Sequence, residues 1–241
     1  MERLERTHWW FHGKRVAVGA LLRRARVQDP SAEEVTVDVG CGTGAVLERF
    51  GGQSASIGID DHWEALRHAR MKAGPQLMLS DARALPFREA SIDRIFLLDV
   101  AEHVQEDELV FAEVRRALNP NGLAVIHVPA HPALWSSHDE AVHHVRRYTR
   151  RRLKRRLEEA GLQPIVLTYT FAGILLPAVA VRAWKRKLPG HTRVDFDVSP
   201  GWMNRILHRW QDLEARWLGW RNLPFGLSLG AVVRCAPRVS Q

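Results

Sequence analysis

The chain has few cysteines and no apolar run that is expected to cross a membrane. Only two cysteines, Cys41 and Cys235, occur in 241 residues, which excludes a disulfide-stabilised fold. The charged start, Met1 to Arg6, precedes no apolar segment of a signal peptide, so a reducing cytoplasm is the expected compartment. The uncharged stretch at 165–181 contains Pro177 and part of an expected strand, which argues against a transmembrane helix.

Acidic residues are fewer than basic ones. The chain has 27 Asp and Glu against 35 Lys and Arg, a formal net charge of +8, which favours an anionic partner or surface. A hydrophobic share of 46% is ample for the core of one large domain. Nine tryptophans are many for this length, and most lie near the two ends of the chain. The clustered ones are Trp9, Trp10, Trp184, Trp202, Trp210, Trp217 and Trp220.

The segment that says most about function is residues 37–44, VDVGCGTG. A β-branched run that ends in an acidic residue and leads into alternating glycines predicts a buried strand, a tight turn and a helix. Glycine has no Cβ, so the backbone can turn sharply and a ligand can approach its N–H groups. The chain is therefore expected to bind a nucleotide-like cofactor. The same spacing also fits a dinucleotide fingerprint, so the glycines alone do not identify the cofactor.

Expected strands and helices alternate over most of the chain. This alternation predicts an α/β fold with a doubly wound, mostly parallel sheet, which binds ligands beyond the carboxyl ends of its strands. The expected strands are 35–39, 55–59, 77–79, 92–98, 123–128, 162–169 and 229–235, and the expected helices are 10–26, 43–50, 62–72, 107–118 and 149–160.

Residues 171–225 interrupt the alternation and are too long for a plain connection. Apolar residues from Met203 to Trp220 recur at helical spacing, which predicts an amphipathic helix. Basic residues also cluster at 182–187. The insert is expected to be either a lid over the substrate or a membrane-surface element, because tryptophan both packs well and prefers the membrane boundary.

Three aspartates stand where successive strands are expected to end. Asp60 ends the second strand, Asp81 the third and Asp99 the fourth. A carboxylate at Asp60 can accept hydrogen bonds from both ribose hydroxyls of an adenosine. Asp81 can accept from an adenine amino group while the apolar residues of 84–87 pack on the ring. Each aspartate alone is more simply a helix cap, but three of them beside a glycine turn favour an adenosine cofactor.

Four motifs in this order resemble those of the class I S-adenosylmethionine (SAM)-dependent methyltransferases: VDVGCGTG at 37–44, GID at 58–60, DARALPF at 81–87 and DVAEHV at 99–104. The resemblance is to the type 11 branch, which includes small-molecule and ubiquinone-type O-methyltransferases. It implies a Rossmann-like, seven-stranded, mostly parallel sheet with an antiparallel last strand, preceded here by a helical insert. It also implies SAM as the cofactor and S-adenosylhomocysteine (SAH) as the product.

The resemblance assigns residues to the cofactor as well. It implies that the glycine turn passes under the methionine part of SAM and that Asp38 anchors both the turn and the ammonium group. Asp60 would hold the ribose and Asp81 the adenine, while Asp99 would lie near the sulfonium end. The full set implied for the cofactor is Asp38, Gly40, Cys41, Gly42, Gly44, Asp60, Asp61, Asp81, Ala82, Asp99 and Val100.

Two segments supply candidates for a catalytic base, which methyl transfer needs when a hydroxyl must lose its proton. His103 follows the fourth expected strand. Residues 135–148, WSSHDEAVHHVRRY, follow the fifth and, with residues 8–11, are similar to bacterial methyltransferases found among cell-envelope sugar and lipid genes. On that match His144 is favoured over His143. The candidate catalytic set is His103, His138, Asp139, His144 and Tyr148, with Asp139 expected to orient a histidine.

His138, Asp139, His143 and His144 could also bind a metal ion. Histidine-rich surface loops are more often not metal sites, so no metal is predicted. Cys41 has no neighbouring base in the sequence and is expected to be a small turn residue rather than a nucleophile.

Residues 146–156 form a dense basic run without an acid, which is either a solvated helix face or a contact for an anionic partner. Anionic lipid headgroups or a lipid-linked diphosphate fit the run together with the aromatic insert. Nucleic acid fits less well, since residues 99–102 read DVAE where amino-methylating nucleic-acid enzymes of the family carry an Asp/Asn-Pro-Pro-Tyr/Phe segment.

Together these features predict a cytoplasmic SAM-dependent methyltransferase that can also work as a peripheral protein on the inner membrane face. Its expected reaction is O-methylation of a small-molecule or lipid- or sugar-linked acceptor. The alternatives are an RNA or protein methyltransferase that uses the basic run, a non-catalytic SAM-binding partner subunit and, more remotely, a nicotinamide dehydrogenase. The oligomeric state and the acceptor stay open. The expected organisation is an N-terminal aromatic helix at 1–30, a SAM-binding core at 31–170, the insert at 171–225 and the last core strand at 226–241.

Overall fold

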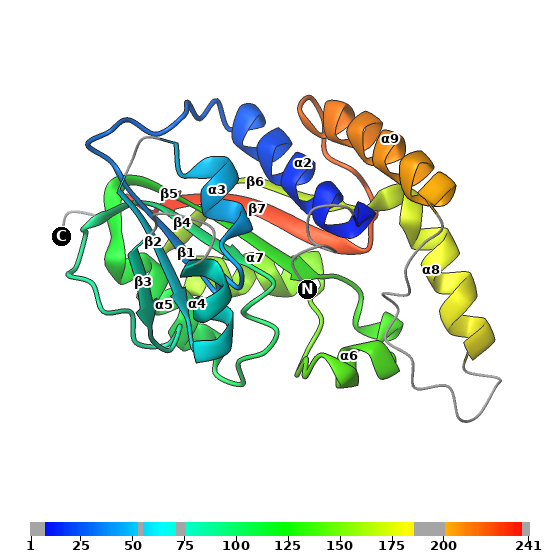
Figure 1. Ribbon diagram of the computed structural model, residues 1–241, viewed down its shortest axis with the longest axis horizontal. Helices are drawn as coiled ribbons and strands as arrows, with labels where there is room; N and C mark the ends of the chain where they lie inside the picture. The colour runs from blue at the N-terminus through cyan, green and yellow to red at the C-terminus, as the bar shows by residue number, and fades with distance from the viewer. Residues whose placement is uncertain (1–7, 53–54, 71–75, 186–200, 238–241) are drawn as a thin grey trace.

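A computed structural model describes residues 8–52, 55–70, 76–185 and 201–237. They form a seven-stranded sheet in the order β3-β2-β1-β4-β5-β7-β6 (Figure 1). Neighbouring strands from β3 to β5 pair in parallel, whereas β7 is antiparallel to both β5 and β6. The predicted α/β, Rossmann-like fold with an antiparallel last strand is therefore confirmed. The strands are β1 (Val35–Val39), β2 (Ala55–Asp60), β3 (Gln76–Leu79), β4 (Ile92–Leu98), β5 (Leu118–Pro129), β6 (Leu162–Thr170) and β7 (Ser228–Cys235).

Two helices were not expected, α6 (Ser137–Ala141) and α8 (Ala172–Lys185), whereas the others lie where apolar periodicity predicts them. The short helix α6 lies in the segment after β5 and begins at a capping box made by Ser136 and Asp139. The helices are α2 (Trp9–Arg24), α3 (Ala45–Phe50), α4 (Trp63–Arg70), α5 (Asp107–Ala117), α6 (Ser137–Ala141), α7 (Arg150–Glu159), α8 (Ala172–Lys185) and α9 (Gly201–Leu218), with a 3-10 turn at Pro132–Leu134.

The central strands are apolar on both faces because helices cover both sides of the sheet. β1 and β4 have the expected bounds, whereas β5 begins at Leu118 rather than at residue 123. Leu118 pairs with Ile92 across an irregularity in the β4–β5 ladder, so the Asn-Pro-Asn-Gly segment is drawn into the strand. This leaves the carboxyl ends of the parallel strands in register at one edge of the sheet.

The insert is helical in its described parts. α9 packs along α2 beside the sheet, and the two helices are seen side by side in Figure 1. The backbone N–H of Trp9 donates to Oδ1 of Asn204 at 2.8 Å, and His12 Nε2 lies 2.8 Å from Asp212 Oδ1. Glu214 is buried and accepts from the backbone N–H groups of Phe171 and Gly173, which joins α9 to the start of α8. The expected basic cluster at 182–187 and Trp184 lie outside the described side chains.

Within the described part of the chain, none of the helices combines the length and the apolar character that crossing a membrane requires. The uncharged stretch at 165–181 is divided between β6 and α8, as its proline and strand character suggested.

Candidate functional site

The glycine-rich turn after β1 has the backbone geometry that only glycine adopts without strain. Gly40, Gly42 and Gly44 all have positive φ, at 74°, 52° and 82°. A Cβ on Gly40 would lie 2.3 Å from Cγ2 of Val100, so this glycine lets the turn close on the segment after β4. A Cβ on Gly42 would meet nothing within 4 Å. The turn therefore presents bare backbone to open space, as a cofactor cradle requires.

Two strand-end aspartates shape this cradle. Asp60 at the end of β2 accepts from the backbone N–H groups of Gly42 and His62, each at 2.9 Å, and so fixes the turn. Asp38 in β1 is almost fully buried, and its Oδ2 has no hydrogen-bond partner in the described part of the chain. Burial raises the pKa of Asp38 to about 8, against the opposing charge of Lys14. An unpaired buried carboxylate beside a bare glycine turn fits the ammonium group of SAM.

The remaining cofactor candidates lie around the same edge. The Asp81 carboxylate is 2.7 Å from Arg83 Nη2, which lowers its pKa, and the same arginine pairs with Glu106. Asp61 is 69% exposed and pairs with His62 at 2.6 Å. Cys41 is buried, and burial raises the pKa of its thiol, which suits a packing residue rather than a nucleophile.

Asp99 stands at the end of β4 in a strained backbone conformation, with φ of 58°. Its Oδ2 lies 2.9 Å from Nζ of Lys14 in α2, and its Oδ1 lies 2.6 Å from Nδ1 of His127 in β5. Nε2 of that histidine lies 3.1 Å from Oγ1 of Thr170. Burial opposes the ionisation of Asp99, but its two partners outweigh burial, and its pKa lies below the ordinary value. The end of β4 therefore carries a fixed negative charge.

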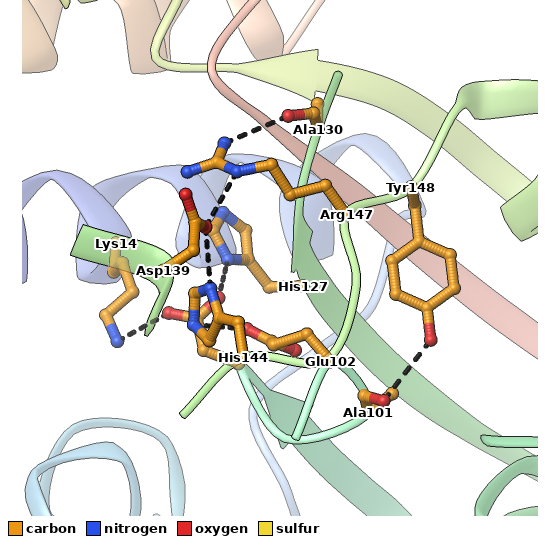
Figure 2. Close-up of polar contacts among 10 residues, drawn as sticks. Lys14, Ala101, Glu102, His127, Ala130, Asp139, His144, Arg147 and Tyr148 are labelled. Atoms are coloured by element: carbon orange, nitrogen blue, oxygen red, sulfur yellow. Dashed lines mark hydrogen bonds and ion pairs between the residues drawn. The ribbon is translucent and has the colours of Figure 1, made fainter. Parts of the chain in front are cut away.

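Next to Asp99, a carboxylate and two histidines form a compact cluster. Glu102 is fully buried, and among the described residues neither of its carboxylate oxygens has a hydrogen-bond partner. His144 Nε2 lies 3.8 Å from Glu102 Oε1, and the rings of His103 and His144 meet edge to face with centroids 4.8 Å apart. The ring of His138 lies 6.5 Å from that of His144. The two segments that supplied candidate bases thus converge at one edge of the sheet (Figure 2).

Asp139 holds His144 in place. Asp139 is fully buried in α6, and its Oδ1 lies 2.9 Å from His144 Nδ1 and 2.7 Å from Arg147 Nε. Arg147 also donates to the backbone oxygen of Ala130 at the end of β5 (Figure 2). Burial raises the pKa of Asp139, but these hydrogen bonds outweigh burial and keep it below the ordinary value. The ionised carboxylate therefore orients the His144 ring and leaves its Nε2 facing Glu102.

A comparison with protein-family models places the cofactor edge in a known family. Residues 37–126 match the model described as a methyltransferase domain. These residues are similar to a methyltransferase domain, and the sheet around them has the class I fold. The match supports SAM as the cofactor and SAH as the product, and the buried Asp38 and the open glycine turn fit both.

Other similarities support the fold of this methyltransferase domain. The Mus musculus protein named "Probable tRNA methyltransferase 9B" is 32% identical over 108 residues, 44% of this chain and 24% of that protein. A solved complex of the Haloferax volcanii Trm112 methyltransferase activator with a methyltransferase has a TM-score of 0.63 at 19% identity, covering 100% of this chain and 94% of that chain. Haemonchus contortus phosphoethanolamine N-methyltransferase 2 with SAM has a TM-score of 0.58 at 15% identity, covering 98% of this chain and 59% of that chain. This chain spans only 23% to 34% of the length of the curated relatives it matches.

Tyr148 does not lie where the sequence placed it. Its side chain is fully buried, and its hydroxyl donates to Asp107 Oδ2 at 2.7 Å. The same hydroxyl lies 3.3 Å from the backbone oxygen of Ala101 (Figure 2). Burial and the Asp107 carboxylate raise the pKa of this hydroxyl far above its ordinary value. Tyr148 therefore fixes the segment after β5 to the core and does not reach an acceptor, which corrects its place among the catalytic candidates.

Among the residues that the structure describes, a cluster next to the end of β4 has the spacing to hold a metal ion. Ligand atoms of Glu102, His103 and His144 all lie within 4.8 Å of one another. A second group, Asp60 to His62, has the same spacing, but Asp60 already binds the turn and Asp61 is exposed. The sequence grouped His138, Asp139, His143 and His144 as possible metal ligands, and only His144 belongs to this cluster. Asp139 instead binds Nδ1 of His144, the ring nitrogen that faces away from Glu102.

Sequence reasoning missed three residues of this edge. Lys14 lies in a helix with no local signal for a site, and only the fold brings it to Asp99. Glu102 is part of the DVAEHV motif, but the sequence alone assigned it no function. His127 did offer a signal, because it interrupts the otherwise apolar strand β5. A polar residue inside a buried strand needs a partner, and here the partner is Asp99.

Proposed function

We propose that this protein transfers the methyl group of SAM to a hydroxyl oxygen of a small-molecule or lipid- or sugar-linked acceptor. The observation that carries the proposal is the oriented His144, which lies with His103 at the edge where the cofactor turn and the ends of β4 and β5 meet. SAM supplies an activated methyl group, so the protein contributes mainly alignment, which is worth about 7–11 kcal/mol. A hydroxyl acceptor additionally needs a base, which contributes roughly 10²–10⁴-fold in rate.

The residues divide into two tasks. Asp38 and Asp60 bind the ammonium and ribose of the cofactor, and Asp81 with Ala82 binds the adenine. The ionised Asp139 accepts from Nδ1 of His144, so the Nε2 nitrogen is left as the proton acceptor. As the acceptor oxygen takes the methyl group, its proton moves to this nitrogen and SAH leaves. His103 and His138 line the same place and bind or orient the acceptor.

The exposed aromatic surface of the insert favours a lipid-linked acceptor over a free small molecule. Such an acceptor places the protein on a membrane surface as a peripheral protein, on the cytoplasmic side. Of the two roles that the sequence left open for the insert, a lid over the substrate or a membrane-surface element, this favours the membrane-surface element.

The basic run at 146–156 gives less support to an RNA or protein acceptor than the sequence suggested. Its arginines are largely used inside the protein: Arg147 binds Asp139, and Arg146 and Arg156 both pair with the buried Asp107. Lys154 and Arg155 pair with acids one turn further along α7. A run whose charges are already paired offers few free contacts to phosphate groups.

The test is to incubate the protein with methyl-labelled SAM and a total extract of its source cells, then to separate the lipid, small-molecule, protein and nucleic-acid fractions. The proposal predicts label in the organic or aqueous small-molecule fraction, and loss of that label with His144→Ala. Label in RNA or protein would refute the proposed acceptor class. Absence of label with SAM still bound would favour a non-catalytic partner subunit.

A further inference from the structure

One side of α9 is a continuous apolar stripe on the surface. Its members recur every three or four residues and are between 51% and 86% exposed. Soluble proteins rarely expose so large an apolar stripe without a partner. We call this stripe the aromatic face, and it consists of Trp202, Ile206, Trp210, Leu213, Trp217 and Trp220.

Contacts on the opposite side of α9 fix its orientation, so the aromatic face is directed to the surface and does not belong to the core. The opposite side of the helix is buried by Ala215 and Leu218 against Ala17 and Ala20 of α2. Gln211 and Glu214 are also buried, and the carboxylate of Glu214 accepts from backbone N–H groups at the start of α8. The buried side of α9 thus includes two polar residues, Gln211 and Glu214, while its tryptophans are exposed. A helix whose role is only to pack on the core would show the opposite distribution.

The exposed charges around the aromatic face are mostly of one sign. Among the described residues from 201 to 221, four arginines are exposed, Arg205, Arg209, Arg216 and Arg221, against one acid, Asp212, whose side chain is 48% exposed. Three of them, Arg205, Arg209 and Arg216, follow one edge of the face at helical spacing. Of the two acids of α9, Glu214 is buried and Asp212 pairs with His12 at 2.8 Å.

We infer that the aromatic face binds an anionic lipid bilayer. Tryptophan prefers the level of the lipid headgroups, and arginine beside it gains from anionic lipids, about 1 kcal/mol per basic residue near the surface. A helix with this arrangement lies in the plane of the interface, with its apolar side turned into the membrane. A second copy of this chain fits the face less well, because a symmetric contact would bring the like-charged arginines together.

The aromatic face is linked to the methyltransferase edge through one helix. α2 packs against α9 with one side and sends Lys14 to Asp99 with another. Binding of α9 to a membrane would therefore fix the position of α2, the helix whose Lys14 contacts Asp99. Binding to vesicles can be measured without SAM or an acceptor, so it tests the aromatic face alone. An effect of vesicles on the rate of methyl transfer would rest on the proposed function as well.

The experiment is sedimentation of the full chain with phosphatidylcholine vesicles, with or without phosphatidylglycerol, at low salt and without SAM. Trp217→Ala/Trp220→Ala should bind anionic vesicles at least about tenfold more weakly, because two exposed side chains lose their burial. Arg205→Gln/Arg209→Gln should lose about tenfold or more for anionic vesicles only. The matched control is Trp63→Ala, because this tryptophan is 61% exposed but lies in α4, well apart from α9 in Figure 1.

Three results would overturn the inference. The protein could stay in the supernatant with anionic vesicles, or Trp63→Ala could weaken binding as much as the α9 variants. Light scattering could also show a dimer that only Trp217→Ala/Trp220→Ala dissociates, which would make the face a protein interface. Methyl transfer into the extract is measured separately, so failure of vesicle binding and failure of the proposed function are told apart.

Discussion

Nζ of Lys14 lies 2.9 Å from Oδ2 of Asp99, and this ion pair ties the N-terminal helix α2 to the end of β4. Both side chains are little exposed, at 21% and 22%, so water screens the pair only partly. The pair holds Asp99 in its strained conformation beside the cluster of Glu102, His103 and His144. It is therefore the contact through which α2 shapes the acceptor side of the methyltransferase site.

Lys14→Met should destabilise the protein by about 1.5–3 kcal/mol at neutral pH, the value of a charged hydrogen bond. The pKa of Asp99 lies below its ordinary value in the folded protein, so its stabilisation is present above the unfolded pKa and lost as pH falls. The difference in unfolding free energy between wild type and Lys14→Met should therefore shrink as pH falls below about 4. Denaturant titrations at several pH values measure it. A difference that stays constant with pH would show that Lys14 acts only by packing.

Binding of SAM should release a proton near neutral pH. Burial raises the pKa of Asp38 to about 8, so much of this carboxyl is protonated at pH 7 in the free protein. A cationic ammonium group placed against it favours the ionised form. Calorimetry at pH 7 in buffers of different ionisation enthalpy should show release of a large part of one proton. In Asp38→Asn the buffer dependence should vanish, and affinity should fall roughly tenfold to a hundredfold. Heats that do not depend on buffer in the wild type would contradict the role of Asp38.

His144→Ala should lower kcat by roughly 10²–10⁴-fold while SAM affinity stays unchanged. Asp139→Asn should also lower kcat, because the ring of His144 then loses the carboxylate that orients it. The matched control is His143→Asn, since His143 is exposed and asparagine tolerates its positive φ of 59°. Initial rates and SAM titration on folded variants measure both quantities. Normal turnover in His144→Ala would remove the histidine from the reaction.

No metal is predicted for the reaction, so activity should survive prolonged treatment with EDTA. This is a sharp test because Glu102, His103 and His144 are close enough to hold an ion. The rate is measured before and after chelation, and again after adding Mg²⁺ or Zn²⁺. Loss on chelation with recovery on adding an ion would assign these three residues to a metal site and replace His144 as the base.

The core of the fold could be predicted because its strands are short apolar, β-branched runs bounded by turn residues. β1 and β4 show this pattern and have the expected bounds. β5 begins earlier than expected, since the pairing of Leu118 with Ile92 is a property of the sheet and not of the local sequence. The spacing from Met203 to Trp220 predicted the helix α9 but not which side faces inward, because its buried side is partly polar.

The positions of the glycine turn and of Asp60 and Asp99 at the strand ends could be predicted in the same way, while their roles toward SAM stay predictions. The cluster of His103 and His144 could be predicted only in part. His103 and His144 come from segments far apart in the chain, and the sequence named both without showing that their rings meet. Lys14 and His127 act through Asp99, so their roles depend on distances that only the folded chain defines. Tyr148 illustrates the opposite error, because a tyrosine next to a catalytic motif is here part of the core.

The most direct test of the proposed site is a crystal structure of the protein with SAH. We expect the SAH amino group within hydrogen-bond distance of Asp38 Oδ2, the ribose hydroxyls at Asp60 and the adenine beside Asp81 and Ala82. We also expect the SAH sulfur to point toward the side where His103 and His144 meet. SAH bound elsewhere, or bound with its sulfur turned away from these histidines, would contradict both the cofactor assignment and the proposed transfer.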